Sequence, residues 1–301
     1  MSSSTHGLSH LGAIGFALTG FTCWVLADTT IKLVGQSGLP PYEMVAFLGL
    51  FMAMFLGVYG ISTGQMHALK PKRLDLQMAR ASLDMVNNVC VVVALRHLTL
   101  TLFYILVFTA PMVISLLSAL FLREGLPWRK GLAIGAGFAG VVIAVNPFGS
   151  ARDGDWIGFA ACMVCVACFS VNMVWSRVLT RTEHPESLTF FSGLVTAAAG
   201  FLLMLFIHAE PLTLRTFTGL FAMGLFCALG TSCFYIAVKH TSAANVSQYH
   251  YTQLITGTLL TYLIWHIRPN IYVLVGAALI FASGLYIALA AREVVPLTEG
   301  N

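Results

Sequence analysis

The sequence predicts an all-α integral membrane protein, and three observations support this fold class. Of the 301 residues, 58% are hydrophobic and 9% are charged, against roughly 25% charged in an ordinary soluble domain. The apolar residues form long runs, and about 20 consecutive apolar residues let one helix cross a bilayer. Backbone polar groups in lipid must be paired within a segment, so runs of this length favour helices over barrel strands.

Ten apolar runs are separated by short segments of charged and turn-forming residues. Ten transmembrane helices are therefore predicted, over residues 11–34, 42–62, 76–97, 99–122, 129–147, 156–178, 187–208, 214–238, 243–266 and 270–291. The first run has no Lys or Arg before it and, at about 24 residues, exceeds the apolar core of a cleaved signal peptide. We interpret it as a retained first helix.

An internal repeat divides the chain into two halves. Positions related by an offset of 143 or 144 residues carry the same or a similar residue in three successive spans: Ala94/Ala237, Arg96/Lys239, His97/His240, Thr109/Thr252 and Gly140/Gly284. The repeat predicts halves at residues 1–148 and 149–292, each with five helices, and a tail at residues 293–301. Since five is odd, the second half must enter the membrane with inverted orientation, as in many secondary transporters.

The distribution of Lys and Arg predicts the orientation, because short basic loops stay in the cytoplasm. The side that holds the amino terminus has eleven basic residues: Lys70, Lys72, Arg73, Arg80, Arg123, Arg129, Lys130, Arg177, Arg181, Lys239 and Arg292. The opposite side has five: Lys32, Arg96, Arg152, Arg215 and Arg268. We therefore expect both termini in the cytoplasm.

Polar residues inside the span 76–97 mark one face of that helix. Asp84, Asn87 and Asn88 follow at i, i+3 and i+4, and residues at this spacing share a face. An ionisable residue inside a span normally faces a cavity or a partner, so we expect these three side chains to bind substrate. The alternative for Asp84 is a structural ion pair with Arg80, one turn earlier.

The span 11–34 repeats this theme. Trp24, Asp28 and Lys32 are each four residues apart. The structural alternative is an Asp28–Lys32 ion pair. If the cavity separates them, Asp28 would receive a substrate ammonium or a coupled proton, and Lys32 would meet a substrate carboxylate. Trp24 lies near mid-span, away from the interfacial belt where tryptophans collect, and is predicted to contact a substrate.

Three further spans carry candidate binding residues. In the span 99–122 these are Tyr104 and Phe108. Pro111 is predicted to be a gating residue, since proline leaves a backbone carbonyl of its helix unpaired and allows a kink. The alternative is a bend without a role in gating. The polar stretch 247–253 has two possible cavity-facing sides. We expect the side with Tyr249, Thr252 and Gln253 to face the cavity; the alternative is the side with Gln248, Tyr251 and Thr252. Asn172 is the candidate in 156–178, and Tyr235 is interpreted as an ordinary interfacial residue.

Motifs for other classes of protein are missing from the sequence. There is no phosphate-binding loop, no His-Glu-x-x-His zinc motif and no Gly-x-Ser-x-Gly elbow, which argues against an ATP-driven pump or these enzymes. No basic run suits nucleic acid. All seven cysteines fall in apolar segments and are interpreted as buried reduced thiols, so no metal or other cofactor is predicted.

Four further features occur together: Trp24 in the first span, the link from Arg123 to Pro127, the Gly-rich span that follows (Gly131, Gly135, Gly137, Gly140) and a matching stretch from Gly276 to Gly284. With the ten spans in two halves, they resemble the drug/metabolite transporter superfamily of the EamA type. Length and loop pattern resemble most the YddG-type aromatic amino-acid exporters of bacterial inner membranes. The second half departs from the pattern at Ile267-Arg268-Pro269, which lacks the Glu-Gly that precedes Pro127.

This resemblance implies a central cavity lined by spans 11–34, 76–97, 99–122, 156–178, 214–238 and 243–266, with 129–147 and 270–291 as scaffold. It implies export of small metabolites by alternating access across the inner membrane, with amino acids, aromatic ones especially, as substrates. The alternatives are a sugar or nucleotide-sugar carrier and a membrane-embedded enzyme or lipid-handling protein. The Gly131/Gly135 pair leaves open a homodimer through the span 129–147 or 270–291.

Overall fold

The computed structural model describes residues 10–110, 112–114, 116, 128–145, 155–207, 210–240, 246, 249–250 and 252–292. Over these residues the protein has ten α-helices and one short 3-10 helix, and no strand occurs among them. The all-α fold class is therefore confirmed. Most of these helices are apolar runs bounded by charged or turn-forming residues, whereas α4 and α8 end inside apolar sequence.

The first half contains α1 (His10–Gly35), α2 (Pro41–Ser62), the 3-10 helix η1 (Met66–Leu69), α3 (Leu74–His97), α4 (Leu100–Val107) and α6 (Trp128–Val145). The second half contains α7 (Asp155–Leu179), α8 (Pro185–Met204), α9 (Leu214–His240), α11 (Thr252–Trp265) and α12 (Ile271–Arg292). All but α4 and α11 begin and end within about four residues of the predicted spans.

The two exceptions are shorter than the spans predicted for them. The helix α4 ends at Val107 because the carbonyl of Leu106 accepts both the amide (3.0 Å) and the hydroxyl (2.7 Å) of Thr109, and such local bonds compete with the helical pattern. Pro111, the predicted gating residue, lies outside the described residues. The helix α11 begins at Thr252, after most of the polar stretch 247–253.

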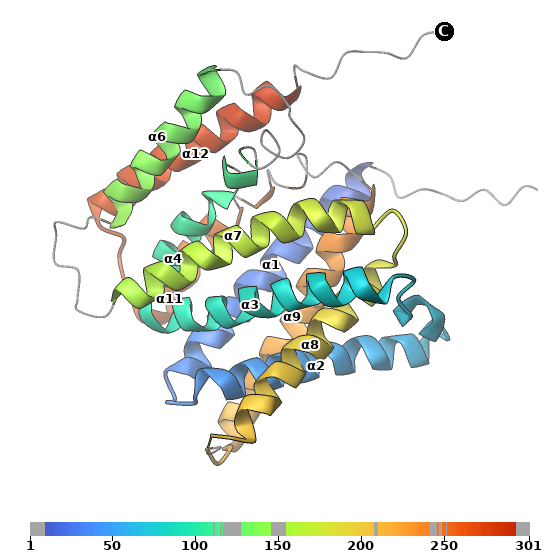
Figure 1. Cartoon of the computed structure of the whole chain (residues 1–301). Coiled ribbons are helices and arrows are strands. Elements are labelled where there is room, and N and C mark those ends of the chain that lie inside the picture. The colour runs from blue at the N-terminus through green and yellow to red at the C-terminus, as the bar shows by residue number, and fades with distance from the viewer. Residues whose placement is uncertain are drawn as a thin grey trace, which may run out of the picture.

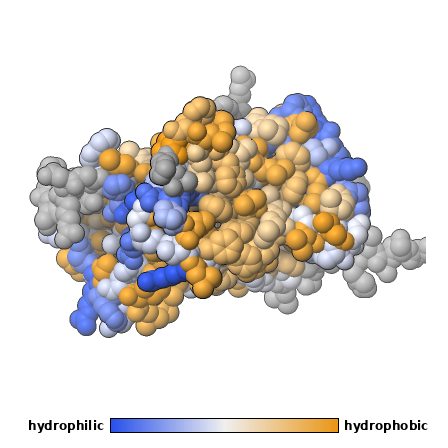
Figure 2. Space-filling model, turned by 90° about the horizontal axis from the view of Figure 1, so that it is seen from below, coloured by the Kyte–Doolittle hydropathy of each residue, from blue (hydrophilic) through white to orange (hydrophobic). Residues whose placement is uncertain are grey.

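Six of the described helices, α1, α2, α3, α7, α8 and α9, are long and apolar enough to cross a membrane. Shorter apolar stretches lie in α4, α6 and α12. Figure 2 shows apolar side chains over the middle of one face and hydrophilic residues gathered towards its ends. A bilayer requires this distribution, because the hydrocarbon core excludes polar groups. The chain is thus a multi-pass membrane protein.

The helices pack mainly in pairs that take one member from each half: α1 with α9, α2 with α8, α3 with α7, α4 with α11, and α6 with α12. Figure 1 shows α6 and α12 side by side at one edge of the bundle and α2 with α8 at the opposite edge. The two halves therefore interleave, and α1, α3, α7 and α9 form the middle of the molecule.

Small residues permit the closest of these crossings. A Cβ added to Gly193 of α8 would lie 2.7 Å from the amide nitrogen of Ala53 and 2.9 Å from the carbonyl oxygen of Gly49, both in α2. A Cβ on Gly140 of α6 would lie 2.9 Å from the carbonyl oxygen of Gly276 in α12. Glycine at a helix crossing lets two backbones approach in this way.

The faces of α6 differ. Its residues Gly131 and Gly135 have open space where a Cβ would stand, so the described helices do not use this pair for packing. That face is available to lipid or to a second copy of the chain, and the predicted homodimer stays a prediction.

Two buried glutamates, at opposite ends of the bundle, accept hydrogen bonds from backbone amides that precede other helices. Near the start of α2, Glu43 accepts a 2.7 Å hydrogen bond from the amide of Glu210, which precedes α9. Just before α8, Glu183 accepts bonds from the amides of Lys72 (3.0 Å) and Arg73 (2.8 Å), which precede α3. In each case a carboxylate pairs backbone donors that no helix satisfies.

Candidate functional site

A cavity lies between the interleaved helices. Its lining comes from α1, α3, α4, α7, α9, Gln253 at the start of α11 and the neighbouring His250, as the resemblance implied, and also from Leu48 and Met52 of α2. Its atom-free space, open mouth included, is about 940 Å³. The helices α6 and α12 contribute no lining residue among those described, so they are placed as scaffold.

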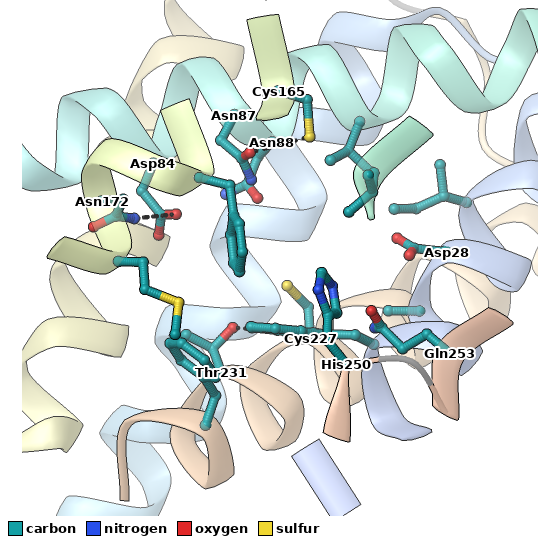
Figure 3. A pocket seen from close by; sticks show the side chains of 18 of the residues that line it. Asp28, Asp84, Asn87, Asn88, Cys165, Asn172, Cys227, Thr231, His250 and Gln253 are labelled. Carbon is teal, nitrogen blue, oxygen red and sulfur yellow. Dashed lines mark hydrogen bonds between the residues drawn. The ribbon is translucent and has the colours of Figure 1, made fainter. Parts of the chain in front are cut away.

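The cavity contains eight of the eleven residues predicted to bind substrate: Trp24, Asp28, Asp84, Asn87, Asn88, Tyr104, Asn172 and Gln253. They come from five helices and converge on one space (Figure 3). Their shared location agrees with the prediction, while their part in binding stays a prediction.

The other three predicted residues do not line this cavity. Phe108 is buried, with its ring 5.3 Å from that of His250. Tyr249 packs against an apolar cluster, and the Thr252 hydroxyl donates a 2.7 Å bond to the Tyr249 carbonyl. Among the described residues, the cavity face of this segment is instead His250 with Gln253, an i, i+3 pair. Gln253 is a predicted binding residue, and His250 is not.

Asp28 has a hydroxyl partner, and among the described residues it forms no ion pair. The Tyr104 hydroxyl donates a 2.7 Å hydrogen bond to Asp28 Oδ2. Lys32, the alternative partner, donates instead to the carbonyls of Leu95 (3.0 Å) and Leu98 (2.6 Å). These carbonyls end α3, where backbone acceptors are unpaired and the helix dipole favours a cation. The predicted alternative of an Asp28–Lys32 ion pair is therefore wrong.

Asp84 does form the ion pair with Arg80, at 3.9 Å. It also accepts a 2.9 Å bond from the side-chain nitrogen of Asn172, whose oxygen accepts a 3.1 Å bond from the Ser176 hydroxyl. The structural alternative for Asp84 is thus confirmed, although the same side chain lines the cavity. Its charge is partly neutralised from behind the cavity wall.

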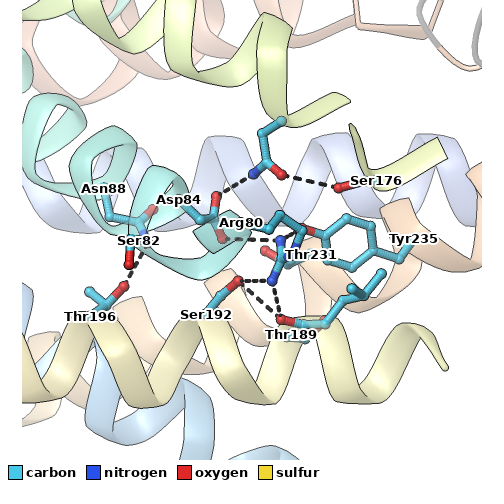
Figure 4. Close-up of polar contacts among 12 residues, drawn as sticks. Arg80, Ser82, Asp84, Asn88, Ser176, Thr189, Ser192, Thr196, Thr231 and Tyr235 are labelled. Atoms are coloured by element: carbon cyan, nitrogen blue, oxygen red, sulfur yellow. Dashed lines mark hydrogen bonds and ion pairs between the residues drawn. The ribbon is translucent and has the colours of Figure 1, made fainter. Parts of the chain in front are cut away.

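Arg80 is fully buried and joins three helices, its own α3 with α8 and α9 (Figure 4). Its Nη1 donates to the Tyr235 hydroxyl at 2.6 Å, and its Nη2 donates to the Leu188 carbonyl at 2.6 Å and the Ser192 hydroxyl at 2.7 Å. Tyr235 is 3% exposed and lines the cavity, so its interpretation as an interfacial residue is wrong. The position of Tyr235 near the end of α9 gives no indication that it binds Arg80.

Aromatic rings form one wall of the cavity. The ring of Trp24 lies 5.0 Å from that of Phe234 and 6.2 Å from that of Phe169. Trp24 Nε1 donates a 3.1 Å bond to the Thr231 hydroxyl, and the imidazole of His250 lies 5.6 Å from Phe169. Edge-to-face and tilted contacts at these distances stabilise aromatic clusters, which gives the wall a fixed shape.

Polar and ionisable groups are costly in lipid, so within a membrane bundle they face a cavity or a partner and mark pathways for solutes. The class of protein that this arrangement defines is a multi-pass membrane transporter. A model of the EamA-like transporter family matches residues 11–146 and again 156–289. The chain therefore belongs to the EamA-like transporter family, which confirms the resemblance to the drug/metabolite transporter superfamily. It is a transporter and not an enzyme.

Several transporters are similar to the chain over most of its length. A riboflavin transporter of Rhizobium johnstonii is 28% identical, covering 92% of this chain and 88% of that protein. An S-adenosylmethionine uptake transporter of Rickettsia bellii is 22% identical (93% and 94% covered). A pseudopaline exporter of Pseudomonas aeruginosa is 25% identical (87% and 93% covered). A crystal structure with 20% identity has a TM-score of 0.68, covering 93% of this chain and 99% of that one, and shows the shared fold alone.

Proposed function

We propose that this protein is a secondary transporter that exports amino acids, aromatic ones above all, across the bacterial inner membrane by alternating access. The observation that carries the proposal is the combination of carboxylates, amides and an aromatic wall in one cavity between the two halves. An ammonium group suits the carboxylates, a carboxylate suits amide and hydroxyl donors, and a ring suits the aromatic wall.

Alternating access rests on ten spans arranged as two inverted repeats, residues 1–148 and 149–292. Two pieces of evidence support this arrangement: the family model matches each half once, and corresponding helices approach each other in antiparallel order. Gly193 of α8 contacts Gly49 and Ala53 of α2, while Gly200 contacts Ala46. Two inverted halves can exchange conformations around a site at their interface.

The repeat also relates residues inside the cavity. Asp28 of α1 and Asn172 of α7 are 144 residues apart (172 minus 28) and both line it. Each is also held by a polar residue of another helix, Tyr104 and Asp84 respectively. We infer that the site lies on the axis that relates the halves, where rocking of either half would expose it to one side at a time.

The proposed orientation, with both termini in the cytoplasm, is supported by the excess of basic residues on that side of the predicted spans. A sugar or nucleotide-sugar carrier is less well supported, because a phosphate-bearing substrate needs cations and the lining residues that the structure describes include no Lys or Arg. The named relatives include both uptake and export proteins, so the direction of transport requires its own measurement.

The test is uptake of radiolabelled phenylalanine, tyrosine and tryptophan into proteoliposomes of the purified chain. We expect saturable uptake, accelerated by unlabelled substrate on the opposite side, and accumulation in everted membrane vesicles, where export appears as uptake. Riboflavin and S-adenosylmethionine belong in the same panel. Transport of either of these with no transport of any amino acid would refute the amino-acid assignment and leave the fold unaffected.

A further inference from the structure

The described residues that line the cavity include acidic side chains and no Lys or Arg. The acidic side chains are those of Asp28 and Asp84. Asp84 has Arg80 at 3.9 Å. For Asp28, the described residues provide no basic group within ion-pair distance. One carboxylate of the cavity is therefore left without a compensating cation.

The basic residues four positions from each lining aspartate, Lys32 on α1 and Arg80 on α3, are already engaged. Arg80 directs its two terminal nitrogens at Tyr235, Leu188 and Ser192, behind the cavity wall. Lys32 is held at the end of α3 by two backbone carbonyls, and its ammonium lies 5.9 Å from the centre of the Trp265 ring. A substrate carboxylate would have to remove one of them from strong hydrogen bonds before it gained an ion pair.

Beside the uncompensated carboxylate lies a surface for a ring. Trp24 and Asp28 are four residues apart on α1, so they stand one turn apart on one face, and both line the cavity. Phe234 extends the ring surface, 5.0 Å from Trp24. A cation is attracted by a carboxylate and also by the faces of aromatic rings, so both neighbours favour a positive group.

We propose that the cavity recognises its substrate as a cation, with an ammonium group at Asp28, an aryl ring against Trp24 and Phe234, and no essential contact to a substrate carboxylate. This inference rests on the proposed function and names its substrate class: arylalkylamines are the preferred ligands, aromatic amino acids follow, and aromatic acids are excluded. Tyr104 holds Asp28 in place through its hydroxyl.

The test uses three ligands that share one ring and differ in charge: phenethylamine, L-phenylalanine and 3-phenylpropionate. Binding to the purified full-length chain in detergent is measured from the ligand concentration that gives half of the maximal rise in the thermal unfolding temperature. A ligand that binds the folded state alone stabilises it by mass action. We expect phenethylamine to act at a concentration at least about tenfold below that of 3-phenylpropionate, because like charges in close contact repel strongly.

The matched variants are Asp28→Asn and Asp75→Asn. Asp75 is an exposed aspartate paired with Arg73 outside the cavity, so its variant should keep the wild-type order of ligands. Asp28→Asn should remove most of the tenfold advantage of the amine. If Asp28→Asn does not fold, Tyr104→Phe, which loses the hydroxyl partner of Asp28, should reduce the advantage in the same direction.

Binding of 3-phenylpropionate as tight as that of phenethylamine would overturn the inference, and so would an amine advantage unchanged in Asp28→Asn. Absence of binding by phenethylamine would overturn it too. The proposed function fails separately, if no labelled amino acid moves in proteoliposomes while phenethylamine still stabilises the protein.

Discussion

The hydroxyl of Tyr104 in α4 donates a 2.7 Å hydrogen bond to the carboxylate of Asp28 in α1. This bond joins two helices whose residues are 76 positions apart, at the wall of the cavity. It fixes which way the carboxylate points, and it is the contact that any cation approaching Asp28 would share. We therefore predict that the Tyr104 hydroxyl affects both the position of Asp28 and the binding of substrate.

Replacing Tyr104 by Phe removes that hydroxyl and leaves the ring. We expect the substrate concentration for half-maximal transport to rise by about threefold to tenfold, since a typical hydrogen bond contributes about 0.5 to 1.5 kcal/mol net. The maximal rate should change little. The control is Tyr59→Phe, at an exposed tyrosine, and transport kinetics are measured for both variants. Equal half-maximal substrate concentrations in the two variants would contradict a role for the Tyr104–Asp28 hydrogen bond.

Arg80 is expected to be the most sensitive polar residue for stability. Arg80→Met removes three strong hydrogen bonds and leaves Asp84 without its cation, which costs about 3 to 5 kcal/mol when one partner of a buried pair is lost. Adding Asp84→Asn should recover part of the loss, because no charge then remains unpaired. Thermal unfolding of the single and double variants measures this coupling, and strictly additive effects would show that the pair contributes nothing.

The crossing of α2 and α8 predicts an asymmetry between glycines. Gly193→Ala places a Cβ 2.7 Å from the Ala53 amide nitrogen, so the helices must separate, and we expect a clear loss of thermal stability. Gly131→Ala has open space and should be neutral or stabilising by up to about 1 kcal/mol through helix propensity. Similar unfolding temperatures for both variants would argue against the close crossing.

Lys32 joins α1 to the end of α3, and we predict that this link closes one end of the bundle. Lys32→Met should loosen this end, so that Cys227, which lines the cavity, reacts faster with a membrane-impermeant maleimide added from the side where α1 ends. Mass spectrometry of labelled peptides gives the rate at Cys227. Lys239→Met, at an exposed lysine of α9, is the matched control and should leave that rate unchanged; an equal rate in Lys32→Met would exclude the closure.

The sequence by itself determined the membrane class, most helix boundaries and a large part of the cavity lining. Hydropathy decides these features locally, because each apolar run must satisfy its own backbone inside lipid. Polar residues within such runs are costly unless they face a cavity or a partner. For this reason Asp28, Asp84, Asn87 and Asn172 could be selected without knowledge of the fold.

The tertiary structure alone decided which of two acid–base pairs with the same spacing forms an ion pair. Asp28–Lys32 and Arg80–Asp84 are both i, i+4 pairs, yet only the second forms an ion pair. The difference arises because the unpaired carbonyls at the end of α3 lie within reach of Lys32, and spacing along α1 contains no information about them. In the same way, the choice of His250 over Tyr249 depends on which helices surround that segment, since its sequence is polar on every side.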